Sequence, residues 1–294
     1  MKKHSSMALV VFAVCMVSYS GPMVKGALNE GASPISVALL RMLAAALLML
    51  PYEARQCVRR RIPMKLTPAQ WGLTALAAAF LAAHYITWIT SLTGTSTFAS
   101  VALVCTQPLF VAFFSYVLFR ERTPRRALPG ALLALLGAVT IALSGLSGQE
   151  AQATGQEALR SNLLALAGAV LMAAHCLAGR QIRQTLAAEV YTPVLYLITA
   201  LLLALCLPLS GLPYMAGLVI GSTLLGHAVF AYALSGVSAN VISFALLGEP
   251  VGAMIFSMIF FGEVPTWPVA LGGLLTLMGL ALYLAFAGGE KQPA

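Results

Sequence analysis

Long apolar stretches alternate with short polar segments along the whole chain. An α-helix rises 1.5 Å per residue, so about 20 apolar residues cross a hydrocarbon core of about 30 Å. Backbone groups left unpaired in lipid cost several kcal/mol each, so each stretch is predicted to be one continuous helix. The predicted spans are Ser6–Val24, Pro34–Leu50, Pro68–Ser91, Ser96–Phe119, Ala127–Ser144, Ser161–Gly179, Thr192–Leu207, Tyr214–Leu234, Asn240–Phe261 and Pro268–Phe286. The fold class is therefore an all-α integral membrane protein with ten transmembrane helices.

The chain also contains an internal repeat. Shifting the sequence by 142 positions places Gly94–Gly137 on Gly236–Gly279 without a gap, and twelve of these 44 positions are identical. A looser match places Pro34 on Pro193 and Met16 on Met172. We expect one five-helix repeat in residues 1–146, an external linker in 147–160 and a second repeat in 161–294. Five is an odd number, so the second repeat is predicted to be inverted in the membrane.

Inverted repeats have a known mechanical use. They offer two equivalent asymmetric arrangements, one open to each side of the membrane, which is the geometry of alternating access. The competing interpretation is that duplication only built a stable ten-helix bundle.

Composition agrees with a bilayer as the solvent. Of the 294 residues, 60% are hydrophobic and 9% are charged, and the mean hydropathy is +0.90. A soluble domain carries about a quarter charged residues. The net charge of +8 comes from short basic runs between apolar stretches. That placement favours contact with anionic lipid headgroups over nucleic acid as a partner.

The basic residues also predict the orientation. With a cytoplasmic N-terminus, 14 of the 17 Lys and Arg residues fall inside, only Lys25 and Arg160 fall outside, and Arg41 lies within a helix. Basic residues concentrate in cytoplasmic loops. We therefore expect a multi-pass protein of the cytoplasmic (inner) membrane with both termini cytoplasmic.

Several kinds of chemistry are excluded by missing residues. The chain has no Asp and no G-x-x-x-x-G-K-[ST] loop, which argues against an Asp-rich Mg²⁺ site and against an ATP motor in this chain. The five cysteines are scattered, which favours buried small side chains over disulfides or zinc ligands. No metal, cofactor, catalytic residue or ATPase subunit is expected.

The joint spacing of several motifs resembles the drug/metabolite transporter superfamily, EamA branch, over essentially the whole chain. The residues that carry the resemblance are Pro34, Arg41, Pro108, Glu121, Gly130 and Gly137, then Gly248-Glu249-Pro250, Gly262-Glu263, Gly272 and Gly279. The chain departs from the family pattern at Tyr19-Ser20-Gly21, where Trp-Gly is frequent, and at Arg120, where Gly usually precedes Glu. The resemblance implies movement of small metabolites without ATP, often the efflux of amino acids. It also implies a central cavity lined by the first, third, fourth, sixth, eighth and ninth helices.

Arg41 and Glu249 are ionisable residues inside predicted helices. Arg41 lies about 10 Å from the outer edge at Pro34, and Glu249 about 13 Å from the inner edge at Asn240. They should therefore lie only several Å apart in depth. They could form a structural pair, or a zwitterionic substrate could bridge them, with its carboxylate on Arg41 and its ammonium group on Glu249. Burial favours the neutral form of a carboxyl group, which makes Glu249 the candidate for proton coupling; a neutral, hydrogen-bonded structural Glu is the alternative.

Further polar and aromatic side chains fall at matching depths and are predicted to line the cavity. Aromatic walls with a few polar groups suit an amphipathic ligand or a cation, although interfacial anchoring is the rival interpretation for Trp88. The predicted cavity residues are Tyr19, Arg41, His84, Tyr85, Trp88, Gln107, His175, His227, Phe230 and Asn240.

Two prolines and two acids complete the candidate site. Pro108 and Pro250 should interrupt their helices and free the carbonyl groups four residues earlier, so they are candidate hinges. Glu121 and Glu263 end equivalent helices at opposite faces of the membrane. They are interpreted as gate contacts, as interface acids or as simple surface acids.

These features together favour a secondary transporter that exports a small polar or amphipathic metabolite, such as an amino acid. Its predicted partners are the substrate, membrane lipids and protons as a coupling ion. Uptake of an organic cation by the same fold is the alternative. A membrane enzyme acting on lipid-linked substrates is disfavoured, because it would need clustered nucleophile, base and metal ligands.

Overall fold

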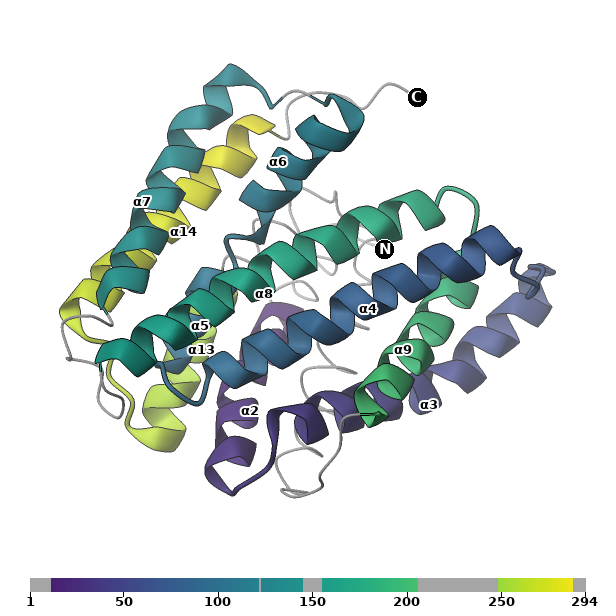
Figure 1. Ribbon diagram of the computed structural model, residues 1–294, viewed down its shortest axis with the longest axis horizontal. Coiled ribbons are helices and arrows are strands. Elements are labelled where there is room, and N and C mark those ends of the chain that lie inside the picture. Colours follow the sequence, from purple (N-terminus) through teal and green to yellow (C-terminus); the bar gives the residue numbers. More distant parts are fainter. Residues whose placement is uncertain (1–11, 122, 145–154, 206–247, 288–294) are drawn as a thin grey trace.

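The computed structural model describes residues 12–121, 123–144, 155–205 and 248–287, and all regular structure within these ranges is helical (Figure 1). A short helix over 12–18 comes first. The elements that follow are α2 (Ser20–Asn29), α3 (Pro34–Arg60), α4 (Pro68–Ser91), α5 (Thr97–Val104), α6 (Gln107–Phe119), a 3₁₀ turn (Arg125–Ala127), α7 (Leu128–Ser144), α8 (Gly155–Ile182), α9 (Ala188–Ala204), α13 (Gly248–Phe261) and α14 (Trp267–Ala287).

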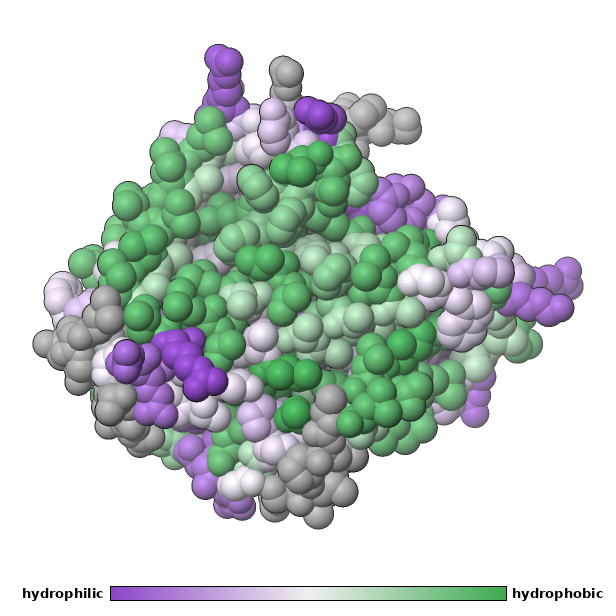
Figure 2. Space-filling model, in the orientation of Figure 1, coloured by the Kyte–Doolittle hydropathy of each residue, from purple (hydrophilic) through white to green (hydrophobic). Residues whose placement is uncertain are grey.

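Six helical stretches in the described ranges are long and apolar enough to cross a membrane. They are Pro34–Arg60, Pro68–Ser91, Thr97–Phe119, Arg125–Ser144, Gly155–Ile182 and Trp267–Phe286, with α9 and α13 as shorter apolar helices. Figure 2 shows apolar side chains over most of the visible face, with hydrophilic ones gathered at its margins. Hydrocarbon-facing surface of this kind is expected for a membrane protein. The predicted window Tyr214–Leu234 lies outside the described residues.

Two helices begin where the sequence predicts, because proline and a capping hydroxyl mark their first turns. The Ser33 hydroxyl accepts a hydrogen bond from the backbone N–H of Ser36 at 3.1 Å, just before α3. Thr67 and Gln70 form a reciprocal capping box at the start of α4. A proline at the first helical position lacks only a hydrogen that would have had no partner there. Caps of this kind fix the helix start locally, which is why the sequence locates it.

The window Ser96–Phe119 was expected to be one helix, and the structure divides it into α5 and α6. The chain turns at Cys105 and Thr106, two residues before Pro108. The Thr106 N–H donates to the carbonyl oxygen of Leu103 at 3.1 Å, so the helix tightens before it restarts. Pro108 cannot donate to the carbonyl group of Val104, and this missing bond accounts for the break.

The second helix extends beyond its predicted end at Leu50. α3 continues through Pro51 to Arg60. Its added segment is held by tertiary contacts: Cys57 is buried, and Arg60 forms an ion pair with Glu189 of α9 at 2.8 Å. The helix ends only at Arg61, which takes the left-handed conformation with φ of 55°. Pro51 removes one backbone hydrogen bond of the helix, and these tertiary contacts compensate for that loss, so the helix continues beyond the proline.

Helices α4 and α8 lie side by side and run in opposite directions (Figure 1). His84 of α4 contacts the carbonyl oxygen of Gly168, while Gln70, nearer the start of α4, bonds Thr185 beyond the end of α8. The first turns of α8, from Gly155, belong to the segment that was predicted as an external linker. Arg160, expected in that linker, is exposed on α8.

Helices α7 and α14 pack closely through glycines (Figure 1). A Cβ atom on Gly130 would meet the backbone of Gly279, and one on Gly137 would meet the backbone of Gly272. Residues that lack side chains let two helix backbones approach in a membrane, where apolar burial offers little drive for association. Under the repeat shift of 142 positions, Gly130 corresponds to Gly272 and Gly137 corresponds to Gly279. The contact Gly130–Gly279 is therefore equivalent to the contact Gly272–Gly137.

Candidate functional site

Arg41 lies at the meeting point of three helices. Its side chain is on α3 and is only 3% exposed. Its Nη1 donates a hydrogen bond to the hydroxyl oxygen of Ser20 on α2 at 3.0 Å. Its guanidinium carbon lies 5.2 Å from the ring centre of Tyr85 on α4, within the range of a cation–π interaction. A buried guanidinium in a membrane protein marks a polar interior in the bundle.

Three aromatic side chains of α4 form a buried cluster beside Arg41. His84, Tyr85 and Trp88 are each less than a tenth exposed. The rings of His84 and Trp88 are stacked, with centres 6.0 Å apart and an interplanar angle of 11°. Because His84 and Trp88 are four residues apart, they share one face of the helix. The rival interpretation of Trp88 as an anchor at the membrane interface does not fit this buried position.

Two histidines fasten this cluster to the backbone. Nδ1 of His84 lies 2.9 Å from the carbonyl oxygen of Gly168, and Nδ1 of His175 lies 3.0 Å from that of Ala77. A carbonyl oxygen only accepts hydrogen bonds, so each Nδ1 carries the hydrogen and donates. This fixes both rings across the α4–α8 interface.

Glu249 at the start of α13 belongs to the same neighbourhood. Its charge interacts with that of Arg41 and with the Cys105 thiol at the α5–α6 break. Tyr196 of α9 also interacts with Arg41 and with Tyr85. Arg41 and Glu249 therefore interact electrostatically, while their predicted roles in binding a substrate stay a prediction. Ser20 and Tyr196 were missed by the sequence analysis, because neither interrupts an apolar pattern in a distinctive way.

Other predicted residues lie at the edge of this neighbourhood or beyond the described ranges. The Tyr19 ring packs edge-on against Phe256 and Phe260 of α13, with centres 5.4 and 5.8 Å apart. Gln107 and Pro108 form the first turn of α6, and Pro250 is buried in the first turn of α13. His227, Phe230 and Asn240 lie outside the described residues. A shallow surface hollow lined by Gln156, Leu159, Arg160, Leu163 and Leu164 lies on the first turns of α8, away from this cluster.

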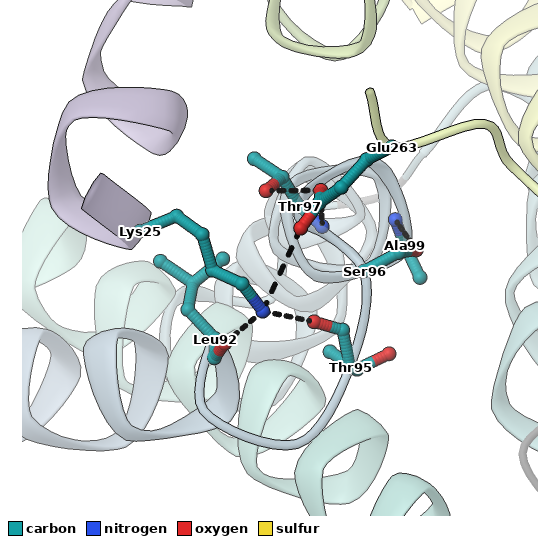
Figure 3. Close-up of polar contacts among 7 residues, drawn as sticks. All are labelled: Lys25, Leu92, Thr95, Ser96, Thr97, Ala99 and Glu263. Carbon is teal, nitrogen blue, oxygen red and sulfur yellow. Dashed lines mark hydrogen bonds and ion pairs between the residues drawn. The ribbon is translucent and has the colours of Figure 1, made fainter. Parts of the chain in front are cut away.

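The structure places Lys25 differently from the sequence prediction. It was assigned to an external loop, and it lies within α2 with 6% of its surface exposed. Its ammonium group donates to the carbonyl oxygens of Leu92 and Thr95 at 2.7 and 3.2 Å and lies 3.7 Å from a carboxylate oxygen of Glu263 (Figure 3). These partners lie 67 or more positions away along the chain, so local sequence cannot reveal them.

Glu121, the counterpart of Glu263, is also paired. Arg180 near the end of α8 donates two hydrogen bonds to its carboxylate, at 2.8 and 2.6 Å. This guanidinium holds the pKa of Glu121 below its usual range. Both acids therefore have basic partners, which favours the prediction of interface contacts over that of simple surface acids.

Apolar helices long enough to span a membrane, around buried polar side chains in the part of the chain that the structure describes, define a multi-pass membrane protein. A sequence model of the EamA-like transporter family matches residues 4–143 and again residues 159–285. The chain therefore belongs to the EamA-like transporter family, within the drug/metabolite transporter superfamily, whose members are transporters rather than enzymes. No curated protein matches the chain.

The fold has relatives among solved structures, of which seventeen chains match. One, described only as the crystal structure of a protein, covers 98% of this chain and is itself covered completely, with a TM-score of 0.64 and 18% sequence identity. At this level of identity the match supports the fold alone.

Proposed function

We propose that this protein is a secondary transporter that exports a small amino acid or a related polar or amphipathic metabolite across the cytoplasmic membrane, with both termini cytoplasmic. The observation that carries the proposal is the electrostatic interaction between buried Arg41 and Glu249, beside the buried aromatic side chains of α4. Buried ionisable groups inside a membrane protein are costly and are kept where they bind or move charge. The family membership agrees with this reading.

Alternating access between two inverted five-helix repeats is the proposed mechanism. One observation in its support is that the family model matches the chain twice, once in each half. A second is the α7–α14 interface, where the contacts Gly130–Gly279 and Gly137–Gly272 exchange under the repeat shift. Reciprocal contacts of this kind are what a two-fold axis between two like units produces.

In the proposed binding step, the substrate carboxylate pairs with Arg41 and its ammonium group pairs with Glu249. Tyr85, His84 and Trp88 then form an aromatic wall against the apolar part of the substrate. Glu249 alternates between a protonated and an ionised form, and the proton that it releases or accepts couples transport to the pH gradient. The α5–α6 break before Pro108 is the proposed hinge on the first repeat.

Transport by purified protein in liposomes tests this proposal. A panel of labelled amino acids and amines is assayed with and without a pH gradient. The wild-type protein should move at least one zwitterion faster when a gradient is imposed. Glu249→Gln should transport at a rate that no longer depends on the gradient, whereas the control Glu157→Gln, at an exposed acid of α8, should behave as the wild type does. Equal pH dependence in Glu249→Gln would refute proton coupling at this residue.

Uptake of an organic cation is the second candidate, favoured by the buried aromatic cluster next to a carboxylate. Aromatic faces attract quaternary ammonium groups. Arg41 weighs against it, because its own cation already lies over the Tyr85 ring. The same assay decides between the candidates, since amines without a carboxylate would be the preferred substrates of a cation carrier.

A further inference from the structure

Each half of the chain contributes one member to two ion pairs. Glu263 of the second half is paired with Lys25 of the first, and Glu121 of the first half is paired with Arg180 of the second. The acids correspond under the 142-position shift. The looser match aligns Met16 with Met172, which is a shift of 156 positions. The same shift aligns Val24, the neighbour of Lys25, with Arg180. The acids therefore occupy equivalent positions in the two halves, and the two bases lie one position apart under the looser shift.

The two pairs lie at opposite ends of the helix bundle. Thr95, which binds Lys25, also donates to Asn162 near the start of α8 at 2.7 Å. Arg180 lies 18 residues further along the same helix, which is a rise of about 27 Å. This distance is close to the thickness of the hydrocarbon core, about 30 Å. We call the two ends the Lys25 end and the Arg180 end.

The Lys25 end is closed by a buried network (Figure 3). Besides the contacts of Lys25, one carboxylate oxygen of Glu263 accepts hydrogen bonds from the hydroxyl and backbone N–H of Thr97, at 2.9 and 3.3 Å. Glu263 thereby adds a second acceptor at the start of α5, whose N-cap is Ser96, and the helix dipole favours a negative charge there. The network thereby connects α2, the α4–α5 loop, the first turn of α5 and the end of α13, and it holds these segments together at the Lys25 end.

The Arg180 end is held by an exposed pair. The side chains of Arg180 and Glu121 are 41% and 46% exposed. Water and salt screen an ion pair in that position, so it contributes little to stability and opens easily. The two ends thus hold corresponding acids in unequal surroundings: the Lys25–Glu263 pair is mostly buried, with side chains 7% and 21% exposed, whereas the Arg180–Glu121 pair is in contact with water.

We propose that these pairs are the two gates of the carrier: Glu263 with Lys25 closes one mouth, Glu121 with Arg180 closes the other, and they open in turn. This inference rests on the proposed function, because gates matter only if a substrate passes between them. The exposed pair is the gate that opens first from the arrangement described here. Opening of the buried gate requires Lys25 and Glu263 to separate, and Thr97 then loses the carboxylate acceptor of Glu263 if that side chain moves away.

Labelling of Cys105 from each side of the membrane tests the gates. Cys105 lies at the α5–α6 break and interacts electrostatically with Glu249. Along α5 and α6 it falls between Thr97 at the Lys25 end and Glu121 at the Arg180 end. A protein that keeps this cysteine alone is made by replacing Cys15, Cys57, Cys176 and Cys206, and it is reconstituted in oriented liposomes. A membrane-impermeant thiol reagent is then added to one side at a time. Glu263→Gln should raise the labelling rate from the Lys25 end at least fivefold, and Glu121→Gln should raise it from the Arg180 end.

Two controls separate gating from a loss of structure. Glu30→Gln changes an exposed acid near the Lys25 end and should leave both labelling rates unchanged. The charge-swapped pair Glu121→Arg with Arg180→Glu keeps the attraction at the other end and should restore the wild-type rate. Unchanged labelling in both Glu263→Gln and Glu121→Gln would overturn the proposal, as would a rise from both sides in either variant.

Failure of the gate proposal is distinct from failure of the transport proposal. Wild-type liposomes that exchange substrate while the variants keep wild-type labelling would refute the gates alone. One-sided labelling changes in a protein that moves no substrate of the panel would support two mobile mouths and count against the proposed transport.

Discussion

Arg120 and Gly262 hold the same left-handed backbone conformation, with φ of 59° and 65°, at the ends of α6 and α13. The acid that follows each of them closes the same hydrogen bond: the N–H of Glu121 donates to Ser115 at 3.3 Å and that of Glu263 to Ser257 at 3.4 Å. The family resemblance implies glycine at both positions, and this chain has arginine at the first. The two helix ends are thus alike in geometry although one has a side chain that disfavours it.

Replacing Arg120 by glycine should stabilise the protein. A left-handed conformation costs a residue with a Cβ atom about 1 kcal/mol, and glycine adopts it without that cost. We expect Arg120→Gly to raise the free energy of unfolding by about 1 kcal/mol, measured by thermal or denaturant unfolding in detergent. Arg120→Ala keeps the Cβ atom and should give no gain. Equal gains in both variants would show that the charge, and not the backbone, limits stability.

Adding a methyl group to Gly279 should destabilise the α7–α14 interface. A Cβ atom there would meet the backbone of Ala134 and Gly130, which cannot move aside as a flexible side chain can. Overpacking of this kind costs about 1–3 kcal/mol, so Gly279→Ala should lower the unfolding midpoint. Gly72→Ala is the matched control, because a Cβ atom on Gly72 has open space around it. A loss in the control as large as that in Gly279→Ala would contradict the assigned role of close packing.

The contact between Glu121 and Arg180 should make stability depend weakly on pH in the acid range. Arg180 lowers the pKa of Glu121 in the folded protein below the ordinary 4.5. The contribution of this ion pair to the free energy of unfolding is therefore complete above pH 4.5. It is lost as the pH falls toward the lower, folded pKa. Both side chains are largely exposed, so the contribution is below about 1 kcal/mol. The measurement is unfolding between neutral and acid pH for the wild type and Glu121→Gln. Between neutral and acid pH, the free energy of unfolding should fall less in the variant than in the wild type. Identical pH profiles would contradict the prediction.

Local signals explain which parts of the fold the sequence could predict. The start of α4 at Pro68 and its end at Ser91 follow from the Thr67 capping box and from the length of the apolar stretch. The extension of α3 beyond Leu50 could not be predicted, because a proline normally marks a boundary and the ion pair from Arg60 to α9 is a tertiary contact.

In the candidate site, too, local sequence predicts some residues, whereas others depend on tertiary contacts that the sequence does not reveal. Arg41 and Glu249 stand out in apolar stretches, so similar depths could be predicted for them, and the structure shows Arg41 buried and in electrostatic interaction with Glu249. Lys25 appeared to belong to a loop, because its stabilising carbonyl groups come from Leu92 and Thr95, which are distant in sequence. Tyr196 gave no signal, since a tyrosine in an apolar helix is common at any position.

Substrate exchange across liposomes tests the central claim most directly. Liposomes loaded with an unlabelled amino acid that the wild type transports are diluted into the labelled compound, and its accumulation is followed. Arg41→Gln removes the proposed carboxylate partner, and Arg160→Gln removes an exposed arginine of α8. Both proteins are first checked for wild-type unfolding temperature and elution volume. We expect exchange to fall at least tenfold in Arg41→Gln and to be unchanged in Arg160→Gln. Full exchange by a folded Arg41→Gln protein would contradict a carrier that binds its substrate at this buried site.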